Sequence, residues 1–318
     1  MVICALCGLC SAGAAVTVEN VFSLHFVDSV EAGRLLAVHD KYIDSWGRFD
    51  IEARAGQEGA TRDDFLERIK SCTRNFSEAD KDSLVKAFSF IDERLSAANM
   101  LLPLPEEFVL VKTTMEEEGG AGAYTRGDII CIGEYVLRKA NVRQLATLVA
   151  HEVFHVLTRD NPEFRKAMYS VIGFNVLDNE ISFAQDVIDR RISNPDVNRY
   201  DSYAWLTVDG KKDRYTMVIY SDRDYSGGSF FNYIKIGLIP LDDSFNPVVR
   251  DGKTVIVPLD KASDFYDKVG RNTGYVINPE ECLADNFSIA VCGTDKELPD
   301  PKITERIISL LRSSKFSK

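Results

Sequence analysis

The chain has 318 residues, of which 45% are hydrophobic and 27% are charged, the composition of an ordinary globular protein of one or two domains. Its net charge of −11 argues against nucleic acid or an anionic membrane surface as the main partner. No run of 18 or more apolar residues is present, so the sequence predicts no membrane-spanning segment. It leaves the oligomeric state open.

Residues 1–14 read MVICALCGLCSAGA, a segment of apolar and small residues with no charge before Glu19. The segment resembles the apolar core of a secretory signal peptide that ends in a small-x-small cleavage pattern, although basic residues are missing near its start. We therefore expect residues 1–14 to be a signal peptide and the protein to be secreted or periplasmic. The alternative is a buried first strand or helix in a cytoplasmic protein.

Four cysteines follow this segment, namely Cys72, Cys131, Cys282 and Cys292. An oxidising compartment would allow a disulfide between Cys282 and Cys292. Four buried free thiols are equally compatible with the sequence.

Residues 15–105 are predicted to form a helical N-terminal region, with apolar residues at helical spacing over residues 62–98. Ser77 followed by Asp80 is typical of a helix N-terminus. Pro103 and Pro105 break the pattern and mark the predicted boundary to residues 106–318. Whether residues 15–105 act as a propeptide is left open.

Residues 106–318 are predicted to be an α+β domain. Strands are expected at 108–114 and 129–133, and an apolar, buried helix at 141–158. Residues 203–258 are β-rich and divided by turns. Helices are expected from Pro279 and at the end of the chain.

His151 and His155 bracket a glutamate in the pentapeptide HEVFH. Residues four apart on a helix share one face, so both imidazoles can be directed at one metal ion. Glu152 is displaced by about 100° around the helix, beside the ion, where a general base can take a proton from water. The alternative is a pair of hydrogen-bonded core histidines in a metal-free α+β domain.

A catalytic zinc site has three protein ligands and an open position. Because His25 and His39 lie far upstream and no histidine follows His155, the third ligand is expected to be a carboxylate.

The segment NPEECLADNF, residues 278–287, contains the strongest candidate. In a helix that begins at Pro279, Glu281 and Asp285 lie on one face. Glu281 can bind the metal, and Asp285 can accept the far N–H of a ligating histidine. Glu280 is the substitute ligand, and an acidic first turn favoured by the helix dipole is the alternative interpretation.

HEVFH with the later Glu281-Cys-Leu-Ala-Asp285 resembles the gluzincin class of zinc metallopeptidases, to which thermolysin belongs. The resemblance covers two short segments. It implies that His151, His155 and Glu281 bind one zinc ion per chain, that Glu152 is the general base and later proton donor, and that Asp285 supports a ligand.

The resemblance also implies a zincin-like fold for residues 106–318, with a small mixed sheet, an active-site helix and C-terminal helices. It implies hydrolysis of a peptide or protein substrate. The strand 129–133, or the segment 123–133 around it, would be the edge strand that pairs with an extended peptide.

Two departures from the family pattern are evident. The interval from His155 to Glu281 is long, which predicts a β-rich insertion at about residues 203–258. No histidine remains downstream to stabilise an oxyanion, so Tyr275 is the first candidate, followed by Tyr225 and Arg271. A zinc-stabilised binding or structural protein that lacks catalysis is the alternative function.

Overall fold

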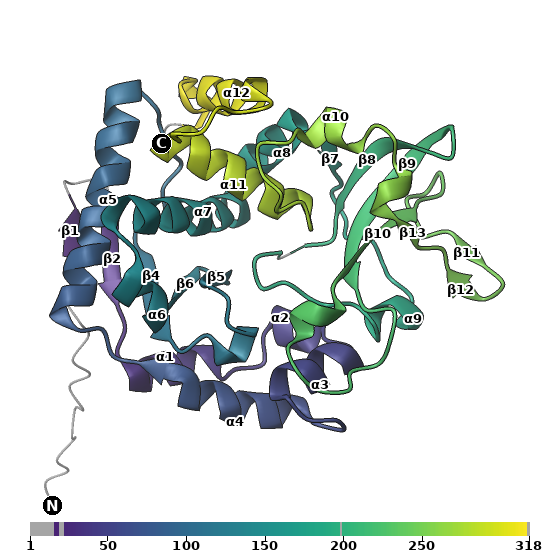
Figure 1. The fold of residues 1–318 in the computed structure, drawn as a ribbon, viewed down its shortest axis with the longest axis horizontal. Coiled ribbons are helices and arrows are strands. Elements are labelled where there is room, and N and C mark those ends of the chain that lie inside the picture. The colour runs from purple at the N-terminus through teal and green to yellow at the C-terminus, as the bar shows by residue number, and fades with distance from the viewer. Residues whose placement is uncertain (1–15, 19–21, 198, 317–318) are drawn as a thin grey trace, which may run out of the picture.

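The computed structural model describes residues 16–18, 22–197 and 199–316. The fold is mixed α+β, as predicted, and contains two larger sheets and several helices (Figure 1). The predicted signal peptide, with Cys4, Cys7 and Cys10, lies outside the described residues. Among the helices described, none has the length and apolar character needed to cross a bilayer.

The region before Pro103 is largely helical and also contributes strands to a sheet. The predicted helix start at Ser77 is confirmed: its hydroxyl accepts from the Asp80 N–H, and the Asp80 carboxylate accepts from the Ser77 N–H. The elements are β1 (Val16–Val18), β2 (Phe22–Phe26), α1 (Ser29–Leu36), α2 (Lys41–Asp44), α3 (Arg48–Ala55), α4 (Arg62–Cys72), β3 (Thr73–Arg74) and α5 (Glu78–Ala98).

The first sheet has the strand order β1-β2-β4-β6-β5, with β3 also pairing with β4. It joins β2 in parallel to β4 (Phe108–Thr113), and β4 in parallel to β6 (Ile129–Gly133). β5 (Ala123–Arg126) pairs antiparallel with the outer side of β6. The expectation that 129–133 is the edge strand is therefore wrong, because the turn at Gly127, where φ is +58°, folds β5 back over it. The edge strand is β5, within the wider segment 123–133.

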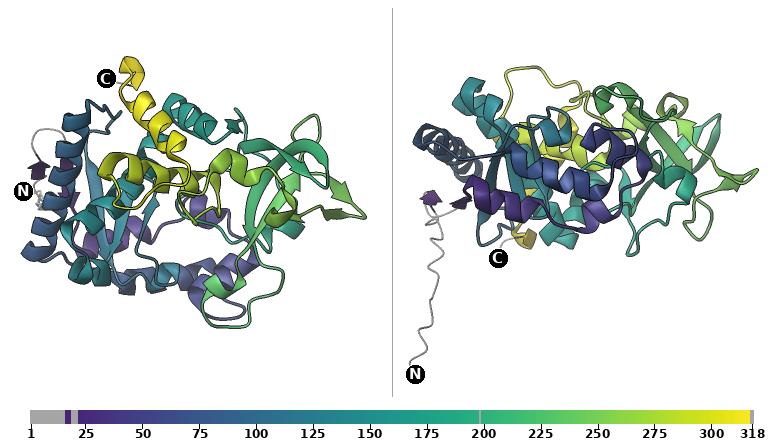
Figure 2. Two further views of the ribbon diagram at one scale, coloured as in Figure 1. Left: turned by 45° about the horizontal axis from the view of Figure 1, so that its top comes forward. Right: turned by 90° about the horizontal axis from the view of Figure 1, so that it is seen from below.

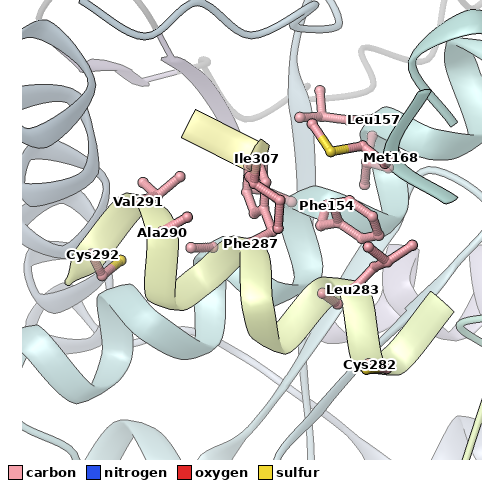
Figure 3. Packing of buried hydrophobic residues seen from close by; sticks show 14 of the residues in the cluster. Phe154, Leu157, Met168, Cys282, Leu283, Phe287, Ala290, Val291, Cys292 and Ile307 are labelled. Atoms are coloured by element: carbon pink, nitrogen blue, oxygen red, sulfur yellow. The ribbon is translucent and has the colours of Figure 1, made fainter. Parts of the chain in front are cut away.

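Helices cover both faces of this sheet. α1 and α4 pack on one face, and the other face is covered by α5 and α7 (Val142–Asp160). α11 (Pro279–Cys292) packs on α7 (Figure 1). Figure 3 shows α11 against its neighbours, with Phe287 near Phe154 of α7 and Ile307 of α12 (Pro301–Leu311). The remaining short helices of this part of the molecule are η1 (Glu116–Glu118), α6 (Glu134–Lys139), α8 (Pro162–Val171), α10 (Phe265–Val269) and η4 (Ser314–Phe316).

Cys282 and Cys292, like Cys72 and Cys131, are buried free thiols. The two residues lie at opposite ends of α11. Ten residues of helix separate them by about 15 Å, too far for a disulfide.

The second sheet has the order β13-β10-β9-β8-β7, and its pairings are antiparallel. It lies at the end of the molecule opposite α5 (Figure 2). The strands expected over 203–258 form most of it. Its elements and their neighbours are β7 (Phe174–Val176), α9 (Gln185–Ile188), β8 (Ser202–Val208), β9 (Lys211–Tyr220), η2 (Phe230–Tyr233), β10 (Lys235–Pro240), β11 (Val249–Arg250), β12 (Lys253–Thr254), β13 (Val257–Pro258) and η3 (Leu259–Lys261).

Candidate metal centre

The helix α7 carries the histidine pair. Its N-terminus is fixed by a capping box between Asn141 and Gln144, and Pro162 begins the next helix directly after it. The predicted helix 141–158 is thus confirmed with small shifts at its ends. His151 and His155 lie on one face, and their ring centroids are 4.9 Å apart.

The helix α11 begins at Pro279, as predicted, and presents its acidic first turn to α7. The Asn278 side chain caps the helix by accepting the Glu280 N–H at 2.9 Å. Glu280 and Glu281 follow directly, and Asp285 lies one turn beyond Glu281.

Three predicted ligands, His151, His155 and Glu281, converge between the two helices. Glu281 Oε2 lies 3.0 Å from His151 Nε2 and 3.7 Å from His155 Nε2. Ligand atoms of the three residues lie within 4.8 Å of one another. Two imidazoles and one carboxylate are a donor set typical of catalytic zinc.

Each histidine is supported by a carboxylate on its other nitrogen. His151 Nδ1 lies 2.9 Å from Asp285 Oδ1, and His155 Nδ1 lies 3.3 Å from Glu280 Oε1. These pairs leave both Nε2 atoms directed toward the same space, an arrangement found around metal-ligating histidines. Asp285 therefore occupies the place that the sequence predicted for it.

Glu280 belongs to the support of His155 rather than to the converging ligands. It accepts hydrogen bonds of 2.5 Å from Thr158 and from Tyr169, and Arg165 lies 3.9 Å away. The sequence did not reveal this role, because the partners come from α7 and α8 and only the fold brings them together.

The site fits a cation. His155 Nε2 is buried and has no hydrogen-bond partner among the described residues, although it lies close to the fully buried Glu281. Burial opposes protonation of His151, but hydrogen bonds to Asp285 and Glu281 outweigh it and raise its pKa. A metal ion among the three side chains would satisfy the unpartnered nitrogen and take the place of that proton.

Glu152 lies on the β5 side of the histidines. Its side chain is buried, and its Oε2 accepts a 2.7 Å hydrogen bond from the Thr125 hydroxyl. Burial raises the pKa of Glu152. Oxygens of Glu152 and Asp196 and a nitrogen of His155 lie within 4.8 Å of one another.

Tyr275 is the tyrosine that the fold brings to the histidines. Its ring centroid is 6.2 Å from that of His151, and the residue is 41% exposed, so an incoming molecule can reach it. Tyr225 instead packs on Phe49, and the Arg271 guanidinium stacks on the Tyr266 ring.

Sequence reasoning missed Asn194 and Asp196. The Asn194 side-chain amide donates to Glu281 Oε1, and Asp196 Oδ1 accepts the Thr125 N–H at 2.6 Å. Both residues stand in an irregular segment with no periodic spacing, so no local pattern pointed to them.

Comparison of the chain with protein-family models, with curated proteins and with solved structures gives no match.

Proposed function

We propose that the chain is a zinc-dependent hydrolase, specifically a metallopeptidase of the gluzincin class with a zincin-like arrangement. The observation that carries this proposal is the convergence of His151, His155 and Glu281, with a carboxylate behind each histidine. The antiparallel edge strand β5 lies beside α7 and supports the proposed zincin-like arrangement. Zinc bound there, one ion per chain, would polarise a substrate carbonyl and make a water molecule more acidic.

Glu152 is the proposed general base. Thr125 fixes the orientation of its carboxylate, and burial raises its pKa, so it can accept a proton from water and hold it. The same carboxyl group can then pass that proton to the leaving amine.

Tyr275 is the proposed oxyanion donor. Partial burial of the side chain, together with the charges of Glu281 and Asp196, raises the pKa of its hydroxyl. The hydroxyl therefore keeps its proton and can donate a hydrogen bond to a developing negative charge.

β5 and an adjacent apolar pocket are the proposed peptide-binding elements. The pocket lies beside Ala123 and Tyr275, and its apolar lining comes largely from the β-rich part of the chain: Ile192, Ile219, Phe230, Phe231, Ile234 and Ile277. An extended peptide paired with β5 could place an apolar side chain in this pocket.

The Glu152→Gln variant tests the proposal. In zinc-loaded protein, hydrolysis of a broad peptide library should fall by at least about 100-fold, because the general base is lost, whereas zinc content should remain unchanged. Glu163→Gln, an exposed glutamate at the start of α8, is the matched control and should retain activity. Measurable hydrolysis at the same rate by the wild type and Glu152→Gln would contradict the assignment of Glu152 as the general base.

A zinc-stabilised binding protein without catalysis is the second candidate. The hydrogen bond from the Thr125 N–H to Asp196 favours it, because it occupies a backbone group of β5 that a peptidase would offer to its substrate. The second candidate would be supported if the wild type and Asp196→Ala, which frees the Thr125 N–H, both bind stoichiometric zinc and neither cleaves the peptide library.

A further inference from the structure

The outward side of β5 determines where an extended peptide can pair. The Gly133 N–H donates to the Gly122 carbonyl at 3.0 Å, which makes these two residues a hydrogen-bonded pair of the antiparallel ladder. By alternation along the strand, Ala123 and Thr125 direct their backbone groups away from β6. Thr125 is the closer of the two to the site, because its hydroxyl contacts Glu152.

Both outward backbone groups of Thr125 are already engaged. Its N–H donates to Asp196 Oδ1 at 2.6 Å, and its carbonyl accepts from Arg159 Nη2 at 3.0 Å. Among the described residues, the outward groups of Ala123 have no such partner. A peptide can therefore reach the Ala123 end of the strand but not the end beside Glu152.

The segment that blocks Thr125 also reaches the candidate ligands. The Asn194 amide donates to Glu281, and the Asp196 carboxylate lies within 4.8 Å of a nitrogen of His155. The Asn194 side-chain oxygen accepts the Asp196 N–H at 3.0 Å, so one tight turn fixes both side chains. Asp196 is only 8% exposed.

The base of this segment is anchored in the fold. The Ser193 N–H and hydroxyl donate to the Asp50 carboxylate at 2.8 and 2.7 Å, and the Ser193 carbonyl accepts from Arg54. The Pro195 carbonyl accepts from Arg159 at 2.7 Å. These hydrogen bonds fix the position of residues 193–197 across the site.

We propose that residues 193–197 are an internal inhibitory segment, in which Asp196 takes the hydrogen-bonding place of a peptide substrate on Thr125 and lies next to His155, one of the residues that would hold the metal. This inference rests on the proposed function. The peptidase is latent in this conformation and becomes active when the segment moves away from β5. Because the Asp196 carboxylate is buried next to Glu152 and Glu281, repulsion between like charges opposes the closed arrangement unless a cation lies among them.

The test measures access to the metal position in the full chain loaded with cobalt, whose visible absorption reports its coordination. Acetohydroxamate, a small metal-directed probe, is titrated into the wild type, Asp196→Ala, Asp196→Asn and the exposed control Asp178→Ala. Removing the competing carboxylate should tighten probe binding by at least about tenfold in Asp196→Ala, because apparent affinity scales with the fraction of open sites. Asp178→Ala should match the wild type.

Asp196→Asn separates charge from folding. Its amide oxygen can still accept the Thr125 N–H, so it preserves the turn while removing the negative charge, and its probe affinity should fall between those of the wild type and Asp196→Ala. If cobalt binds to the wild type and the probe affinity of both Asp196 variants equals that of the wild type, the inhibitory segment is overturned and the metal site is retained. Cobalt absent from the wild type would overturn both proposals.

Discussion

The contact between helices α7 and α11 has two sides with opposite chemistry. On one side, Phe154 and Phe287 pack with their ring centroids 5.3 Å apart, next to the fully buried Leu283. On the other side, the same two helices bring His155 and Glu281, also fully buried, to within 3.7 Å. Both pairs are removed from water, yet only the aromatic pair gains free energy from burial.

The two sides of the contact therefore have different explanations. Each buried aromatic side chain stabilises the fold by about 1.5–3 kcal/mol. Buried ionisable groups cost free energy unless partners or a metal compensate them. The apolar side explains why the helices pack, whereas the polar side is explained by a function.

The largest expected effect comes from the apolar side. Phe287→Ala should lower the free energy of unfolding by about 3–5 kcal/mol, because it leaves a cavity between α7, α11 and α12. Urea unfolding followed by circular dichroism measures the change. Phe231→Ala, which removes a 46% exposed ring, is the control. A loss of zinc binding in the folded fraction of Phe287→Ala would show that the apolar side also determines the metal site.

Asp285→Ala acts on the polar side of the contact, and its effect should be intermediate. It removes the acceptor from His151 Nδ1, which frees the ring to turn, and zinc affinity should fall by about 10–100-fold. Competition with a chromogenic chelator measures it. The control is Asp295→Ala, whose carboxylate pairs with Arg143 at the surface. Unchanged zinc affinity would mean that Asp285 does not orient a ligand.

Thr158→Val should have the smallest effect. It removes one donor to Glu280, but Tyr169, Arg165 and His155 still hold that carboxylate. Zinc affinity should fall by less than about tenfold, or about 1.4 kcal/mol. Thr147→Val on the same helix, whose hydroxyl donates to the Arg143 carbonyl away from the site, serves as the control. A loss as large as that of Asp285→Ala would mean that Tyr169 and Arg165 do not suffice to hold the Glu280 carboxylate.

Sequence predicted what local spacing encodes. The four-residue spacing from His151 to His155 defines one face of a helix. The four-residue spacing from Glu281 to Asp285, after Pro279, defines another, and the fold packs the two faces against each other. The coarse α+β class was also readable, because helical and strand periodicities occupy separate stretches.

The features that could not be predicted from the sequence depend on contacts between distant segments. Glu280 differs from its neighbour Glu281 only in the partners that the fold provides. Asp196 meets Thr125 across 71 positions of the chain, and no periodicity encodes such a meeting. The edge strand was predicted at 129–133 but is β5, within the wider predicted segment 123–133. A short strand that follows glycines has a weak sequence signal.

We propose that His151, His155 and Glu281 hold a metal ion. This is tested by zinc content, measured by mass spectrometry on the chain from Ala15 onward after refilling with zinc, for the wild type, Glu281→Ala and the exposed control Glu297→Ala. We expect close to one zinc per chain in the wild type and control, and a clear loss in Glu281→Ala. A wild type without zinc would leave His151 and His155 as core residues, and full zinc in Glu281→Ala would contradict the ligand assignment.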